Sequence, residues 1–407
     1  MTHTWKFRIT PYRVIMLALA GCAAGLIILR LFKGLGATTN LNDHWPWGLW
    51  ITVDVLTGVA LAGGGFTTAF LVHILHRNEY RPIVRAALLT SLIGYLLVLV
   101  GLFLDVGRWY NAWRPFFFWG HHSVLFEVFW CISLYTLVQL LEFGEVVFER
   151  LKVASWQKRL EKLLPLLFVL GVVLPTLHQS SLGSLWIITI GRLHPLWWSM
   201  ALPVFFLLSA AFVGPAMVTL ESALSSKAYN RELEFPVLES LSRLGRWLLG
   251  AYLLLKIIDL SYRGQWGALL EGSLESRLFL LEMVGGVLLP LVMYFTPAIR
   301  KTKAGLVTAS SLVVAGVILN RINVAITGFL RTAGGSYFPA WTEFLVTLGL
   351  ISLGILMYCF AVENLHILPA QEKSLQETVA RATDINLTVA PNYPISVQRN
   401  GRKASLL

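Results

Sequence analysis

Ten long apolar segments divide this chain and constrain its fold more than any other feature. Each approaches or exceeds the roughly 20 residues that a helix needs to cross a bilayer. Only 14% of the residues are charged, whereas a soluble domain usually carries about 25%. The sequence therefore predicts an all-α polytopic membrane protein of about ten transmembrane helices. The expected segments are approximately 12–33, 47–75, 84–107, 122–148, 163–190, 196–222, 241–262, 277–297, 305–329 and 343–365.

The number of segments allows two four-helix bundles plus flanking helices. The first bundle would span about 47–190 and the second about 196–329, inside a transmembrane domain of 12–368. Most of the 33 lysines and arginines lie in residues 1–11, in alternate loops and in the tail 369–407. Cytoplasmic loops carry an excess of Lys and Arg, so we expect both termini in the cytoplasm. The same rule explains the formal charge of +11 better than nucleic-acid binding does.

The middle of segment 163–190 carries an unbroken polar run from His178 to Ser181. Polar and ionisable side chains are costly in hydrocarbon, so such residues mark a functional site by default. The depth of a residue in the membrane can be estimated from the helical rise of about 1.5 Å per residue. By this estimate, polar residues of the three preceding segments lie in the same outer half of the first bundle. This convergence predicts a pocket there. The converging residues are Asp54, Asp105, Arg108, His121, His122, Glu127, His178, Gln179, Ser180 and Ser181.

A quinone would suit such a pocket, because its isoprenoid tail enters lipid while its two carbonyls need hydrogen-bond donors. We expect His178 to act as donor and proton relay, since imidazole exchanges protons near neutral pH. Carboxyl groups would pass protons onward, and Arg108 would stabilise developing negative charge. The candidate catalytic residues are His178, Asp105, Glu127 and Asp54, and the candidate quinone contacts are His178, Gln179, Ser180, Ser181, Arg108, Asp54 and His122.

Structural interpretations stay open for several of these residues. Asp105 and Arg108 are three positions apart on one helix and could form an ion pair at the interface. His121 and His122 could be rim residues in water. His178 could bridge two helices by hydrogen bonds.

A second polar set lies toward the inner side of the first bundle. Tyr135, Gln139, Glu142 and Glu145 share one segment and could form part of a proton path from the cytoplasm. Glu142 and Glu145 could instead pair with inner-face arginines and lysines. In the second bundle we favour a mutual charge network over transport groups. Its members would be Lys256, Asp259, Asn320, Arg321 and Asn323.

Haem is the rival explanation for the histidines. A haem held by two histidines needs them on different helices at matched depth. Of the nine histidines only His178 lies deep in a segment. The three cysteines lie far apart in apolar runs with no C-x-x-C motif, so no metal site is predicted. We therefore expect neither a haem nor an iron–sulfur cluster in this chain.

Seven motifs lie along the apolar part of the chain: DHWPWGLWITVDVLTGVALAGGG (43–65), LDVGRWYN (104–111), SVLFE (123–127), LEF (141–143), LPTLHQSSLGSL (174–185), HPLW (194–197) and YFPAWTE (337–343). Together they resemble the NrfD/PsrC family of polysulfide reductase membrane subunits, and within it the hydrogenase-2 (HybB) type. The likeness runs from about residue 12 to 365. It implies a ten-helix protein of the bacterial inner membrane with no cofactor of its own, and a quinone site near the outer leaflet.

The resemblance also implies partners. An iron–sulfur, ferredoxin-like subunit on the outer face would exchange electrons with menaquinone or another quinone through this chain. Through that subunit the chain would be connected to a hydrogenase, a molybdopterin enzyme or a multihaem cytochrome. The matched motifs place Asp54, Asp105, Arg108, Glu127 and His178 at the quinone site. Some members of the family couple the reaction to proton translocation.

Two other classes of function are open. A secondary transporter or proton channel would use the same intramembrane charges, with gates on both sides and broken helices between repeats. A simple membrane anchor would need no buried carboxyl or imidazole groups. Polar residues crowd the outer half of one bundle, which favours the quinone-reactive subunit of a respiratory oxidoreductase complex. Such a subunit is not a complete enzyme alone.

Overall fold

A computed structural model of the chain describes residues 5–120 and 122–369. All regular structure in these residues is helical, which confirms the predicted all-α membrane fold. The long helices are α1 (Pro11–Lys33), α4 (Arg81–Asp105), α6 (Val124–Leu151), α7 (Ala154–Ser184), α8 (Leu202–Ala228), α9 (Phe235–Tyr262), α14 (Lys303–Ala325) and α15 (Trp341–Asn364).

Two further crossings are built from several shorter helices in sequence. The first consists of η2 (Trp50–Thr57), α2 (Gly58–Leu61), α3 (Gly63–Ala69) and η3 (Phe70–Ile74), and the second of α11 (Leu274–Leu280), η7 (Leu281–Leu288) and α12 (Leu289–Phe295). In both crossings the hydrogen bonds widen to the π pattern, in η2, η3 and η7. π-Turns inside helices are rare and are frequent at functional sites.

Within the described residues, nine stretches are long and apolar enough to cross a membrane. The tenth expected span, α9, has 28 residues but carries Arg246, Lys256 and Asp259 in its apolar part. The length of α9 matches that of the other spans, but its charged residues keep it out of the nine apolar stretches. The predicted N-terminal region 1–11 falls partly outside the described residues, and the predicted tail 369–407 falls outside them except for Pro369.

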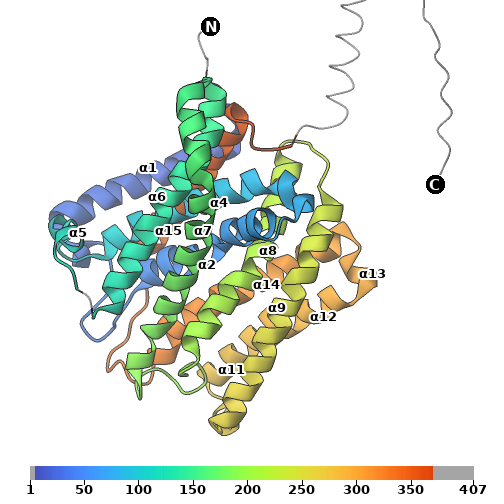
Figure 1. The fold of residues 1–407 in the computed structure, drawn as a ribbon. Coiled ribbons are helices and arrows are strands. Elements are labelled where there is room, and N and C mark those ends of the chain that lie inside the picture. Colours follow the sequence, from blue (N-terminus) through green and yellow to red (C-terminus); the bar gives the residue numbers. More distant parts are fainter. Residues whose placement is uncertain (1–4, 121, 370–407) are drawn as a thin grey trace, which may run out of the picture. The chain divides into compact units, whose positions relative to one another are not determined.

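The helices pack in two groups flanked by one pair. The crossing from η2 to η3 packs with α4 and α7, and α6 packs on α4 and α7. In the second group α8 packs on α9 and α14, and α14 packs on η7 and α12. Figure 1 shows α8, α9, α12 and α14 side by side in yellow-green to orange. The flanking pair, α1 and α15, forms a close contact of its own.

Side chains join distant parts of the chain at both ends of the helices. One end carries the loops 34–49, 106–120, 185–201, 263–273 and 326–340, and we call it the aromatic-loop end. There Glu343 accepts hydrogen bonds from Tyr337 Oη (2.5 Å) and Asn40 N (2.9 Å). At the opposite end Arg13 forms an ion pair of 2.5 Å with Glu363. The flanking pair is thus fastened at each end.

The second group of helices depends on one backbone-to-backbone contact. A Cβ built on Gly286 of η7 would overlap the Cα of Gly316 on α14. We expect Gly286→Val to lower the stability of the protein by about 1–3 kcal/mol, because the helices must separate to accept the side chain. The measurement is the midpoint of thermal unfolding in detergent.

Gly285→Val is the matched control for this prediction. A Cβ at Gly285 meets only Leu281 Cδ1, at an ordinary 3.7 Å. Equal unfolding midpoints for the two variants would show that the close approach contributes nothing.

Candidate functional site

A cavity of about 420 Å³ lies at the aromatic-loop end of the first group of helices. All four crossings of that group contribute to its walls, which are mostly apolar. A cavity of this size can hold a ring system, and mostly apolar clefts with a few polar groups are typical ligand sites. The lining residues are Trp47, Ile51, Val55, Leu56, Leu102, Asp105, Val106, Pro115, Ser123, Leu125, Phe126, Val128, Phe129, Leu182, Leu185 and Trp186.

Asp105 is the one acidic residue among those lining residues, and it lies at the C-terminal end of α4. The fully buried Arg30 of α1 holds this end of α4 in place. Its Nε donates to Leu104 O at 2.7 Å, and its Nη2 donates to Val106 O at 2.5 Å. The positive charge of Arg30 acts on Asp105, while its Nη1 has no hydrogen-bond partner. Arg30 therefore positions the carboxyl group that faces the cavity.

Asp54 is buried on the same crossing as several lining residues, but it faces the flanking pair. Its Oδ2 accepts a hydrogen bond of 2.8 Å from Thr347 on α15. Asp54 also packs against Gly101 of α4, where a Cβ would come within 2.9 Å of it. Its carboxyl group is thus partnered within the helix packing.

His178 is fully buried, and both of its ring nitrogens are bonded. Its Nδ1 lies 3.0 Å from the carbonyl of Leu174, and its Nε2 lies 2.7 Å from Tyr95 Oη. Because a carbonyl can only accept, Nδ1 carries the proton and Nε2 accepts from the tyrosine. His178 precedes the lining residue Leu182 by one helical turn, so it lies about 6 Å along α7 from the cavity wall.

Further buried polar groups extend from His178 along the inside of the first group. Tyr95 and Tyr135 stack edge to face, with ring centroids 4.6 Å apart. Gln139 donates to Ser91 Oγ at 2.5 Å, and Glu142 has a buried Oε1 with no partner. Residues 135, 139 and 142 recur at helical spacing, so they share one face of α6. We call this set the buried row: Ser91, Tyr95, Tyr135, Gln139, Glu142 and His178.

The other predicted site residues lie elsewhere. Arg108, His122 and Glu127 are exposed, and Glu145 is half-buried beyond the buried row. Ser180 and Ser181 donate to carbonyls of their own helix, and Gln179 donates to Val59 O at 3.0 Å. His121 lies outside the described residues. Asp105, predicted as a catalytic residue, is the predicted site residue that lines the cavity.

Trp186 is a lining residue that the sequence analysis did not select. It follows the C-terminal end of α7 and is 1% exposed, with its ring edge-on to Trp47 at 4.6 Å between centroids. Its indole N–H is buried and has no hydrogen-bond partner. A rule that notes each tryptophan just past the end of a polar membrane helix would have selected it.

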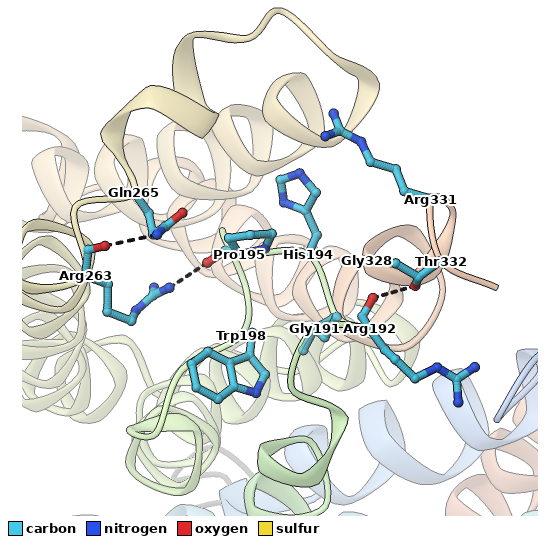
Figure 2. Close-up of a pocket in the computed structure, with 11 residues that line it drawn as sticks. Gly191, Arg192, His194, Pro195, Trp198, Arg263, Gln265, Gly328, Arg331 and Thr332 are labelled. Carbon is cyan, nitrogen blue, oxygen red and sulfur yellow. Dashed lines mark hydrogen bonds between the residues drawn. The ribbon is translucent and has the colours of Figure 1, made fainter.

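A second cavity, of about 450 Å³, lies between the loops at the same end (Figure 2). Arg263 on its wall is bound to Asp259 and to the carbonyl of Pro195, and Arg331 is bound to Glu271 and Glu275. Burial and the charge of Arg331 lower the pKa of His194 in the same wall. Arg263 and Arg331 are therefore already bound to groups of this chain.

The second group of helices contains a buried charge network. Glu282 accepts hydrogen bonds from Trp197 Nε1, Asn320 Nδ2 and Asn323 Nδ2, at 2.8–2.9 Å. Arg321 donates to Asn320 and to Ser209. The sequence analysis selected the cations and amides of this network but not Glu282.

These features define a polytopic membrane protein with a largely apolar ligand cavity between its helices. Comparison with known proteins then identifies its family. The family described as polysulphide reductase, NrfD, matches residues 37–333, and the chain belongs to this family. The resemblance inferred from the sequence motifs is thereby confirmed.

Three relatives are similar to this chain over most of its length. The chain is 36% identical over 351 residues to a probable Ni/Fe-hydrogenase 2 b-type cytochrome subunit of Escherichia coli K12, covering 84% of this chain and 89% of the relative. It is 27% identical over 372 residues to the integral membrane subunit of a menaquinone reductase of Nitratidesulfovibrio vulgaris, covering 84% and 87%. Another N. vulgaris protein is 34% identical over 377 residues, covering 90% and 96%. By their names, the first is a cytochrome subunit of a hydrogenase and the second is a membrane subunit of a menaquinone reductase.

The name of the E. coli relative contradicts the expectation that this chain has no haem, because a b-type cytochrome subunit is a haem protein by name. The expectation rested on counting deep histidines. Haem iron also accepts methionine, cysteine or tyrosine ligands, so such a count cannot exclude haem. In the described residues His178 could ligate an iron only after its hydrogen bond to Tyr95 broke. The residues around His178 therefore do not fit a haem as they stand.

Proposed function

We infer that this chain is the quinone-reactive membrane subunit of a respiratory oxidoreductase complex. In this proposal it passes electrons between an iron–sulfur partner subunit at the aromatic-loop end and menaquinone or another quinone. The observation that carries it is the apolar cavity of about 420 Å³, walled by four helices and bearing one carboxyl group. The menaquinone reductase and hydrogenase relatives support the same reading.

The chemistry is the interconversion of a quinone and a quinol. Two electrons and two protons convert both ring carbonyls to hydroxyls, and the reverse reaction releases them. The iron–sulfur partner supplies or accepts the electrons. Asp105 is the group of this chain placed to give a proton to, or take it from, a ring oxygen in the cavity. The low-polarity walls exclude water from competing hydrogen bonds.

The buried row is proposed to carry protons along the first group of helices. His178 and Tyr95 can exchange a proton through their 2.7 Å hydrogen bond, and Glu142 lies at the far end of the row. Glu145 would connect the row to the cytoplasm. Proton translocation coupled to the redox reaction would use this route.

The location and the partners belong to the same proposal. In this proposal both termini lie in the cytoplasm, because the lysines and arginines of the sequence are concentrated in the N-terminal region, in alternate loops and in the tail. The aromatic-loop end would then face outward in a bacterial inner membrane, where the partner subunit docks. That partner would link the chain to a hydrogenase, a molybdopterin enzyme or a multihaem cytochrome.

The test of this function is purification of the chain from native membranes, followed by identification of the bound subunits and extraction of quinone. We expect an iron–sulfur subunit and roughly one quinone per complex. The complex should also reduce or oxidise an added short-chain quinone. Proton flux with no quinone-dependent electron transfer would instead favour a transporter or proton channel.

His178→Ala tests the buried row. We expect the complex to assemble, while quinone turnover falls about tenfold, because the imidazole link to Tyr95 is lost. The measurement is the steady-state rate with a short-chain quinone. The control is His366→Ala, at an exposed position near the end of α15. An unchanged rate in the His178 variant would remove His178 from the mechanism.

A further inference from the structure

The buried tryptophans of the described chain differ in one respect. Trp45, Trp50 and Trp197 each donate their indole N–H, to Gly335 O, Glu343 O and Glu282 Oε2 respectively. Trp186 is equally buried, and its N–H has no partner. A buried Trp N–H normally finds an acceptor, and an orphaned donor costs about 1–3 kcal/mol. The orphan in Trp186 therefore needs an explanation.

The position of Trp186 supplies that explanation. The residue lines the cavity of about 420 Å³ together with Asp105, which belongs to a different helix. Neighbouring side chains hold the Trp186 ring in place, with centroid distances of 4.6 Å to Trp47 and 5.8 Å to Phe329. Trp186 thus brings an unpaired donor beside an apolar cavity, and a ligand with a carbonyl oxygen is the partner that would satisfy it.

We propose that Trp186 is a quinone-binding residue whose indole N–H donates a hydrogen bond to one ring carbonyl. This inference rests on the proposed function of the cavity. It assigns the head group to the space between Trp186 and Asp105. Trp186 follows His178 by eight residues, about two helical turns. In this arrangement Trp186 orients the quinone ring and Asp105 exchanges a proton with it. His178 does not line the cavity and acts through the buried row.

The first test is Trp186→Phe, which keeps an aromatic ring and removes the N–H. The control is Trp198→Phe, because Trp198 donates to Ile187 O at 3.2 Å and does not line this cavity. The probe is a short-chain naphthoquinone, titrated against the purified complex. We expect Kd and KM to rise about fivefold for Trp186→Phe, the loss of one hydrogen bond, with little change in kcat. The control should bind as the unaltered complex does.

A second variant separates the hydrogen bond from packing. β-(3-Benzothienyl)alanine at position 186 keeps the bicyclic shape of tryptophan and lacks the N–H. It should reproduce the loss of affinity with an unchanged unfolding midpoint. In infrared difference spectra, one carbonyl band of the bound quinone should move to higher frequency in both variants, because the donor is gone.

The outcomes distinguish this inference from the function on which it rests. If the unaltered complex binds no naphthoquinone, the proposed function of the cavity fails and the inference fails with it. If the unaltered complex binds, but both variants at position 186 bind equally well with unshifted carbonyl bands, the inference alone is overturned. A fivefold loss shared by the Trp198 control would also overturn it.

Discussion

A complex carrying Asp105→Asn is expected to turn over quinone about 100-fold more slowly than the unaltered complex. Asparagine has nearly the same shape as aspartate but cannot exchange a proton, and general acid–base groups contribute about 10²–10⁴ to rates. Asp105 is the acidic residue among those that line the cavity. The loss should appear in kcat while the affinity for quinone stays within about twofold, because the ring contacts remain. Steady-state kinetics with a short-chain quinone measures both.

Asp43→Asn is the control, since Asp43 is an exposed residue of the loop before η2. Both variants should retain their partner subunit and their unfolding midpoint. A normal kcat for Asp105→Asn would move the proton-exchanging group elsewhere. The next candidates would then be Asp54, which is bound to Thr347, and the exposed Glu127.

Glu282→Ala is expected to cause the largest loss of stability. The carboxylate lies fully buried between three donors, and the buried cations Arg321 and Lys256 both interact with its charge. Lys256 lies over the ring of Phe205 at 4.6 Å, and no carboxylate lies within ion-pair distance of its Nζ among the described residues. Removing one partner of a buried ionic network costs about 3–5 kcal/mol, because the remaining charges stay buried.

The measurement is the midpoint of thermal unfolding in detergent, with the exposed Glu232→Ala as control. A double variant, Glu282→Gln with Arg321→Gln, removes both charges and should recover part of the loss. If Glu282→Ala unfolds at the same midpoint as the control, the network does not stabilise the second group of helices. In that case the alternative, that these charges serve transport, would gain support.

The positions of the spans could be predicted because the bilayer imposes a length on any helix that crosses it. The expected segments 12–33 and 343–365 agree with α1 and α15 to within about two residues. The interruptions of the crossing from η2 to η3 could not be predicted. They depend on close packing against neighbours, as where Gly63 faces the backbone of Ala210.

The candidate site was predicted only in part, for a physical reason. Depth along a helix follows from counting residues, and the cavity lies at the end of the first group of helices at which that count gathers the polar residues. The direction of each side chain around the helix axis depends on what packs beside it. Counting therefore selected Arg108 and Glu127, which are exposed, and passed over Arg30 and Trp186, which are buried beside the cavity.

The sequence by itself determined the class of protein, the rough limits of most of its spans and its family, because hydrophobic length and short motifs are local properties of the chain. The tertiary structure alone decided which groups meet. Arg30 reaches α4 from α1, and Thr347 reaches Asp54 from α15, across 74 and 293 residues of sequence. These contacts between distant segments arise from helix packing. In a medium without water, polar groups must find hydrogen-bond partners within the protein.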